Sequence, residues 1–242
     1  MTIAENILQV QANIEMACGH VGRSPSEVTL VAVSKTHSPS LVLEAVEAGL
    51  QHFGENRVEE AETKIPAVNT GVNRPLTWHM IGHIQSRKAR DVVTLFQQIH
   101  SVDTVKLANK LSALCVERDK TLNVLLEVNV SGETAKYGLA ASSWEISSVV
   151  RESLWREIEL VMSLDGINVC GLMTMAPIVE KPEQTRPVFA ALCRLRFALE
   201  QSLGIRLPDL SMGMTDDYPI AIEEGATLVR IGRAIFGERE YK

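Results

Sequence analysis

A lysine at the end of an apolar run is the first residue whose position suggests chemistry. The segment VAVSKTHSP, residues 31–39, is a run of β-branched and small apolar residues that ends at Lys35 and is followed at once by a turn signal. A lysine there is either an ordinary charge that reaches water or an amine held at the mouth of a pocket. In the second case it could form a Schiff base with a carbonyl compound. Other parts of the sequence must decide between the two.

Two glycine-containing loops near the C-terminus have the composition of phosphate-binding turns. SMGMTDD, residues 211–217, places two hydroxyl groups and a glycine before a helical pattern, where backbone N–H groups and a helix N-terminus favour an anion. VRIGRAIFG, residues 229–237, follows the last apolar run, and Gly232 would let the backbone come close to a ligand. Alone, either glycine could simply close a turn, and Ser211 could simply cap a helix. Two such loops at adjacent strand ends favour a phosphate site.

An arginine between these loops completes a set of three groups that suits one cofactor. Pyridoxal phosphate requires an amine for its aldehyde, a cradle for its phosphate and a charged residue facing its ring nitrogen. Lys35, the two loops and Arg230 supply these three groups. An aspartate at the ring nitrogen would keep it protonated and make the ring a strong electron sink, whereas the permanent positive charge of Arg230 disfavours that proton. We therefore expect carbanion chemistry to be weak.

Strand-like and helix-like segments alternate along the chain and explain how these groups could meet. The strand-like runs are expected at 28–34, 52–55, 77–82, 99–102, 122–130, 167–175, 207–214 and 227–232, and the helical ones at 39–49, 56–65, 85–95, 103–117, 143–162, 183–203, 216–224 and 233–237. This alternation requires parallel strands with helical crossovers. Eight units favour an α/β fold with a single (β/α)8 TIM barrel, and a doubly wound open sheet is the alternative.

One further helix precedes the first strand, and no linker divides the chain. Apolar residues recur at helical spacing from Ile3 to Ala17, and Gly19 and Gly22 provide the stop. We expect a single domain over residues 1–242, with residues 1–22 as a helix packed on the barrel. In such a barrel the active site lies at the carboxyl ends of the strands, where the polar side chains of Lys35, Asn56, Ser211 and Arg230 would face one mouth.

Size, charge and cysteine content limit the possible partners. The net charge of −6 disfavours nucleic acid and anionic membrane surfaces, and no run of about 20 apolar residues is present to span a membrane. The four cysteines lie far apart without disulfide or metal-ligand spacing, so we expect reduced thiols, a cytoplasmic location and a small-molecule partner. His79 and His83 have the i, i+4 spacing of helical metal ligands, but they flank a strand end, so no metal site is expected.

Six motifs, in order along nearly the whole chain, closely resemble the pyridoxal phosphate homeostasis protein family, which is related to the N-terminal barrel of alanine racemase. The motifs are VAVSKT, FGENRVEE, TWHMIGHIQSRK, VCGLMTMAP, LSMGMTDD and VRIGRAIFG. The resemblance implies a fold type III barrel that binds pyridoxal phosphate, and it implies the cofactor-binding residues Lys35, Asn56, Ser211, Met212, Gly213, Arg230 and Gly232. In this assignment Lys35 forms the Schiff base, Arg230 faces the ring nitrogen and the glycine loops hold the phosphate. Thr215 stands where the family usually has serine, which keeps the hydroxyl.

The resemblance also implies that catalysis is weak or absent. Alanine racemase uses a tyrosine from a second domain as the base opposite the lysine, and this chain ends at residue 242, directly after the barrel. Tyr137, Tyr218 and Tyr241 lie in no motif that matches that tyrosine. We therefore expect no catalytic residues and no enzyme, but a monomeric protein that holds pyridoxal phosphate and serves its homeostasis, with PLP-dependent apoenzymes as possible recipients. A PLP-dependent amino-acid racemase is the alternative. Lys136 is considered as a second, transient amine for the aldehyde.

Overall fold

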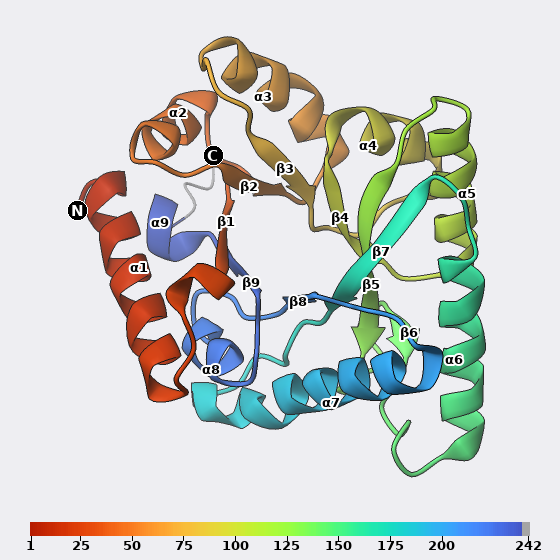
Figure 1. The fold of residues 1–242 in the computed structure, drawn as a ribbon. Helices are drawn as coiled ribbons and strands as arrows, with labels where there is room; N and C mark the ends of the chain where they lie inside the picture. The colour runs from red at the N-terminus through yellow and green to blue at the C-terminus, as the bar shows by residue number, and fades with distance from the viewer. Residues whose placement is uncertain (239–242) are drawn as a thin grey trace.

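Eight parallel strands form a closed barrel in the structure, a computed structural model that describes residues 1–238 (Figure 1). The barrel strands are β1 (Thr29–Val33), β2 (His52–Glu55), β3 (Thr77–Met80), β4 (Gln98–Val102), β5 (Leu122–Asn129), β7 (Ile167–Met173), β8 (Asp209–Ser211) and β9 (Leu228–Ile231). Closure is complete because β4 pairs with β5 and β1 pairs with β9. An open sheet would leave two edges unpaired, so the predicted (β/α)8 barrel is confirmed.

Helices follow the barrel strands and surround the barrel in the predicted order (Figure 1). They are α2 (Pro39–Glu47), α3 (Val58–Thr70), α4 (Ala89–Leu95), α5 (Val105–Val116), α6 (Ser148–Met162), α7 (Arg186–Leu203), α8 (Tyr218–Glu223) and α9 (Arg233–Phe236), with α1 (Ile3–His20) before β1. Three short 3-10 helices, η1 (Pro25–Glu27), η2 (Ser86–Lys88) and η3 (Pro182–Thr185), add single turns.

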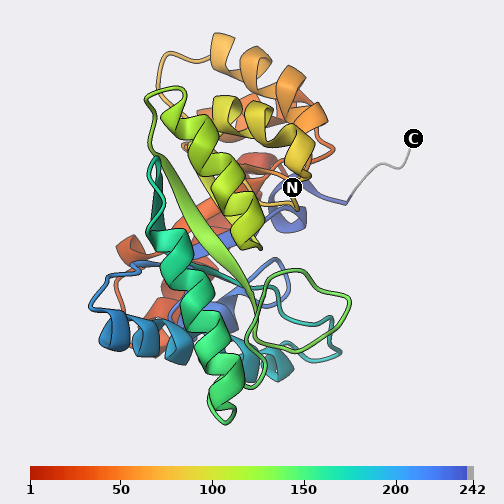
Figure 2. The same ribbon diagram turned by 90° about the vertical axis from the view of Figure 1, so that its right-hand side faces the viewer.

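Two helices miss an expected boundary by five residues: α3 continues through Pro66 to Thr70 instead of ending at residue 65, and α6 begins late. Helix α6 begins at Ser148 and not at residue 143, because Ser147 caps it: its hydroxyl accepts the backbone N–H of Val150. The preceding loop also contains a two-residue strand, β6 (Leu139–Ala140), which pairs in parallel with the end of β5. Figure 2 shows this loop beside the loop that follows β7 at one end of the barrel, where Lys136 Nζ donates to Met175 O at 3.0 Å.

Strand side chains alternate between the helix layer and the inside of the barrel. Trp78 faces outward, since its indole Nε1 donates to Asn69 of α3 at 3.1 Å, and its neighbour His79 therefore points inward. The larger apolar core lies between strands and helices, while a small apolar cluster inside the barrel consists of Val31, Leu125, Met173 and Leu228. Much of the interior is thus left to polar side chains.

The predicted N-terminal helix is confirmed, and it packs against α8 and α9. Thr2 and Glu5 form a capping box at its start, and its buried face includes Ile7 and Val10. Asn6 Nδ2 donates to Ile235 O and Asn13 Nδ2 donates to the Tyr218 hydroxyl, both at 2.9 Å. Helix α1 therefore braces the elements that follow both glycine loops. Among residues 1–238, no helix has the length and apolar character needed to cross a membrane.

Candidate functional site

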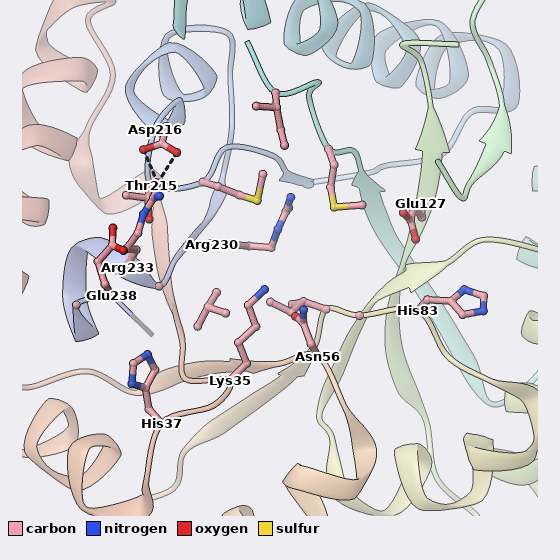
Figure 3. A pocket seen from close by; sticks show the side chains of 18 of the residues that line it. Lys35, His37, Asn56, His83, Glu127, Thr215, Asp216, Arg230, Arg233 and Glu238 are labelled. Carbon is pink, nitrogen blue, oxygen red and sulfur yellow. Dashed lines mark hydrogen bonds and ion pairs between the residues drawn. The ribbon is translucent and has the colours of Figure 1, made fainter. Parts of the chain in front are cut away.

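A cavity of about 620 Å³ lies at the carboxyl ends of the barrel strands (Figure 3). Four of the residues that the sequence singles out line it together: Lys35 after β1, Asn56 after β2, Arg230 on β9 and Gly232 after β9. In Figure 3 the Lys35 side chain extends toward the side of the cavity on which Arg230 lies. The volume is in the range of sites that enclose a small molecule. The lysine is thus part of a pocket and is not a simple surface charge.

Lys35 lies in a turn that three hydrogen bonds of its neighbours hold, two before it and one after it. Before it, Ser34 donates its hydroxyl to Glu55 Oε1 at 2.6 Å and its carbonyl accepts from Lys64 Nζ at 2.7 Å. After it, the N–H of Thr36, which has a positive φ of 68°, donates to Glu60 Oε1 at 2.5 Å.

The buried Lys64 ammonium bonds to both acidic acceptors, Glu55 and Glu60, so the hydrogen bonds on the two sides of the turn are connected through it. It donates to Glu55 at 2.8 Å and to Glu60 at 2.5 Å, and only 4% of the Lys64 side chain is exposed. Burial raises the pKa of Glu55, an effect that the bonds from Lys64 and Ser34 oppose. These residues do not line the cavity, but they determine where the backbone of Lys35 lies.

Arg230 presents a buried cation to the cavity. Its Nη1 donates to the Ser211 hydroxyl at 2.5 Å and its Nη2 donates to Thr174 O at 3.0 Å. Burial lowers the pKa of Arg230 to about 10, and the nearby carboxylates of Asp217 and Glu127 oppose that shift. The guanidinium therefore stays charged at neutral pH.

The two glycine loops adopt tight turns at adjacent strand ends. Gly213 has a φ of 90°, and a Cβ there would lie 2.6 Å from the Cβ of Ala221, so no larger residue fits without displacement. Asp217 Oδ1 accepts the backbone N–H of Met214 at 2.6 Å and closes the first turn. At Gly232 a Cβ would lie 3.2 Å from Val33 O, which shows how closely the end of β9 approaches β1.

The residues of the first loop divide between the cavity wall and the interior behind it. Thr215 lines the cavity, whereas the predicted residues Ser211, Met212 and Gly213 are buried and do not line it. The Ser211 hydroxyl bonds to Arg230 and lies 2.8 Å from His100 Nδ1, so it holds the arginine from behind. The sequence could not show this division, because it depends on how the turn rotates after β8.

Asn56 reaches the cavity because a glycine makes room for it. A Cβ at Gly82 would lie 2.2 Å from the carbonyl oxygen of Asn56, so the loops after β2 and β3 touch through their backbones. Both residues line the cavity.

Glu127 lines the cavity although no sequence motif pointed to it. It lies on β5 and is only 4% exposed. Burial and the nearby charge of Asp103 raise the pKa of Glu127 to about 7, and Arg230 partly opposes them. The available signal was the single acidic residue within the apolar run LLEVNV, at an alternate position to Leu125, which points into the barrel.

His83 and Tyr137 bring two stacked aromatic rings to the cavity. His83 Nδ1 lies 2.9 Å from Asp103 Oδ2, and its ring stacks on Tyr137 with the centroids 4.1 Å apart. Both His83 and Tyr137 line the cavity, so a tyrosine is present there although no motif predicted it. Tyr241, the last tyrosine considered from the sequence, lies outside the described residues.

Two other residues considered from the sequence take different positions. Lys136 bonds to Met175 O and pairs with Glu133, and a role as a second amine stays a prediction. His79 points into the barrel toward His100 whereas His83 pairs with Asp103, so the two histidines do not converge. Within residues 1–238, no three His, Cys, Asp or Glu side chains are grouped to hold a metal ion.

The chain is similar over its whole length to known proteins. Residues 6–240 match the family model described as alanine racemase, N-terminal domain. A pyridoxal phosphate homeostasis protein of Pseudomonas aeruginosa is 45% identical, with 99% of this chain and 97% of the relative covered. One of Aquifex aeolicus is 38% identical, with both chains covered completely.

Solved structures show the same relationship. PipY of Synechococcus elongatus, solved with PLP bound, is 34% identical with a TM-score of 0.82, and the alignment covers 98% of this chain and 100% of PipY. Alanine racemase of Clostridium difficile is 13% identical with a TM-score of 0.72; all of this chain aligns with 58% of the racemase, a likeness of fold alone. The chain belongs to the pyridoxal phosphate homeostasis protein family, whose barrel has the fold of the alanine racemase N-terminal domain.

Proposed function

We propose that this protein binds pyridoxal phosphate in the cavity at the carboxyl ends of the strands and acts in intracellular PLP homeostasis. The observation that carries the proposal is the meeting of Lys35, Arg230 and the two glycine loops around one cavity. The structure of the relative PipY, which was solved with PLP bound, supports the same choice of ligand for this protein. The donors present also suit this ligand: a lysine amine for an aldehyde, tight backbone turns for a phosphate and a cation for the ring nitrogen.

Each residue has a defined part in this proposal. Lys35 forms the Schiff base with the aldehyde, and the turn fastened by Lys64 presents its amine. The backbone around Gly213 and Gly232, together with the Thr215 hydroxyl, holds the phosphate. Asn56 forms part of the wall.

Ser211 and Met212 act from behind the wall. Both are fully buried; Ser211 orients Arg230 at the ring nitrogen, and Met212 supports the turn that carries Gly213. When bound, the cofactor supplies an aldehyde that reacts reversibly with amines, and in other proteins an electron sink for carbanions. A charged Arg230 disfavours the ring proton on which that electron sink depends.

We further propose that the protein holds and releases the cofactor and is not an enzyme. The weak electron sink and the family name, homeostasis protein, both support this role. PLP-dependent apoenzymes are the proposed recipients, with indirect effects on amino-acid and keto-acid metabolism. A cytoplasmic, monomeric protein suits this task, and its four cysteines are free thiols, as expected in a reducing compartment.

The structure gives one observation that favours the alternative, a PLP-dependent racemase or related enzyme. Glu127, with a pKa of about 7, and Tyr137 both line the cavity, so groups able to move a proton are present apart from Lys35. Incubation with D- and L-amino acids in deuterated water separates the two functions. We expect no α-proton exchange above the rate of free PLP. Exchange that is rapid in the wild type and lost in Glu127→Gln would establish the enzyme instead.

Lys35→Ala tests the binding proposal directly. We expect wild-type protein incubated with PLP to show the visible absorbance of a Schiff base, and Lys35→Ala to lack it because no amine remains at that position. Lys110→Ala is the matched control, since it removes an exposed lysine of α5 that does not line the cavity. A colourless wild type would end the proposal, and so would a Lys35→Ala protein that keeps the same band.

A further inference from the structure

A chain of hydrogen bonds crosses the inside of the barrel from the cavity toward its opposite end. Arg230 Nη1 donates to Ser211 Oγ at 2.5 Å, and Ser211 Oγ lies 2.8 Å from His100 Nδ1. His100 Nε2 lies 2.9 Å from His79 Nδ1, and His79 Nε2 lies 3.0 Å from His52 Nδ1. These five residues come from β9, β8, β4, β3 and β2, so the chain connects strands on opposite sides of the barrel.

The two ends of this chain meet different surroundings. Arg230 lines the cofactor cavity, whereas His52, at the start of β2, lines a separate cavity of about 490 Å³ at the other end of the barrel. Between them, Ser211, His100 and His79 have no exposed surface. The inner members must therefore satisfy one another.

The direction of the bonds follows from the arginine. A guanidinium has only donors, so Ser211 Oγ must accept from Arg230. Within residues 1–238, the hydrogen bonds of Ser211 Oγ join it to Arg230 and His100 alone. If His100 also donated to this oxygen, the hydroxyl proton of Ser211 would be buried without an acceptor. Ser211 therefore donates to His100 Nδ1, and His100 carries its own proton on Nε2.

The donor and the acceptor of the two remaining bonds, His100–His79 and His79–His52, follow in the same way, because each ring is neutral. Burial lowers the pKa of His79 to about 3 and that of His100 well below its ordinary value, and it also lowers the pKa of His52. A neutral imidazole has one donor and one acceptor. His100 thus donates to His79 Nδ1, and His79 donates to His52 Nδ1.

We propose that the histidine chain, defined as His52, His79, His100 and Ser211, positions the Arg230 guanidinium, and that all its bonds are donated in one direction, away from the cofactor cavity. Ser211 and Thr174 O fix both terminal nitrogens of the guanidinium. The arginine is then already oriented when a ligand arrives, which lowers the ordering cost of binding. The histidines are positioning residues, and they act through Arg230 without lining its cavity.

The bond direction can be read in the wild-type protein without added cofactor. Long-range ¹H–¹⁵N NMR of histidine-labelled protein distinguishes protonated from unprotonated ring nitrogens. We expect His52, His79 and His100 to be neutral at pH 7, with the proton on Nε2 in each ring. A proton on Nδ1 of His79 or His100, or a charged ring at either position, overturns the proposal.

Substitution at the far end tests whether the chain is coupled. His52→Gln keeps an acceptor for the proton of His79, whereas His52→Leu removes it. We expect the ¹⁵N signals of His100, two hydrogen bonds away, to match the wild type in His52→Gln and to shift in His52→Leu. His20→Leu, which removes an exposed histidine paired with Glu223, is the control and leaves them unchanged. Unchanged His100 signals in His52→Leu refute the coupling.

The link to the cofactor rests on the proposed function and needs its own measurement. We expect PLP to dissociate at least threefold faster from His52→Leu than from His52→Gln, since Arg230 is less well fixed. Equal rates mean that the chain does not position Arg230 for this ligand. If no variant binds PLP, the proposed function fails, while the NMR result still decides the direction of the chain.

Discussion

Arg230 is charged and buried at the cavity, and Glu127 lies in the same cavity with its pKa raised to about 7. The two side chains interact electrostatically, so the state of one affects the other. Burial and Asp103 favour the neutral carboxylic acid of Glu127, and Arg230 favours the carboxylate. At the scale of single residues, the cavity therefore contains one fixed cation and one group that changes charge near physiological pH.

Glu127 is expected to make the folded protein less stable as the pH rises. Its pKa rises from 4.5 to about 7 on folding, so the folded state binds the proton more tightly, and the stabilisation present below pH 4.5 is lost as the pH passes through about 7. Between pH 5 and 8 the free energy of unfolding of wild type should fall by about 2 to 3 kcal/mol relative to Glu127→Gln. Urea unfolding of wild type and Glu127→Gln at pH 5 and at pH 8, without cofactor, measures this difference.

The free energy of unfolding of wild type must be compared with that of Glu127→Gln, because the buried histidines make it depend on pH in the opposite direction. Their pKa values are lowered on folding, so their contribution is lost as the pH falls below 6.5. Glu152→Gln, at an exposed position on α6, is the control and should follow the wild type at both pH values. A constant difference between wild type and Glu127→Gln from pH 5 to 8 would contradict the assignment.

At the scale of elements, the loop after β1 and the start of α3 act together. Glu55 ends β2, and Glu60 and Lys64 lie one turn apart on α3, yet all three bond to the residues on either side of Lys35 or to each other. The i, i+4 spacing of Glu60 and Lys64 lets both side chains reach the same place. Lys35 lies outside any helix or strand, and these bonds fix the position of its backbone.

Glu60→Gln is expected to loosen that turn. The neutral amide weakens the bonds from the Thr36 N–H and from Lys64, which should lower the free energy of unfolding by about 1 kcal/mol and let bound PLP leave faster. Glu59→Gln, at the preceding and more exposed position of α3, is the matched control, since within residues 1–238 the ion pair of Glu59 is with Lys88 alone. Equal PLP dissociation rates in the two variants would remove the positioning role.

At the scale of the whole molecule, α1 holds together the last two units of the barrel. It contacts α8 and α9, which follow the two glycine loops, and its polar side chains bond to both. The short strands β8 and β9 meet through few backbone hydrogen bonds. Packing of α1 on the outside therefore contributes to keeping the proposed phosphate loops in place.

Ile7→Ala tests this packing role. Ile7 is 1% exposed, and removal of its side chain leaves a cavity between α1 and the barrel, so the free energy of unfolding should fall by about 2 to 5 kcal/mol. The adjacent Leu8, 66% exposed, gives a matched control, and Leu8→Ala should change stability by less than about 0.5 kcal/mol. Thermal or urea unfolding measures both. Similar losses for the two variants would show that α1 is not packed as described.

The barrel strands, the helices after them and their order could be predicted from the sequence. Apolar periodicity is a local property, so the N-terminal helix and the alternation of strands and helices could be predicted, and from that alternation the closed barrel. The barrel in turn predicted that Lys35, Asn56 and Arg230 lie together at the carboxyl ends of the strands. The start of α6 was placed five residues too early, because the turn before its serine cap has no strong local signal.

Which side chains face the cavity and which lie behind it depends on the folded barrel, and no local pattern in the sequence shows it. The path of the loop after β8 depends on its contacts with neighbouring strands. Along that path Thr215 reaches the cavity wall, whereas Ser211 is buried against Arg230. The charge state of Glu127 and the chain from His52 to Arg230 likewise depend on burial and on partners far apart in the sequence. Distances and desolvation of this kind arise only when the barrel closes.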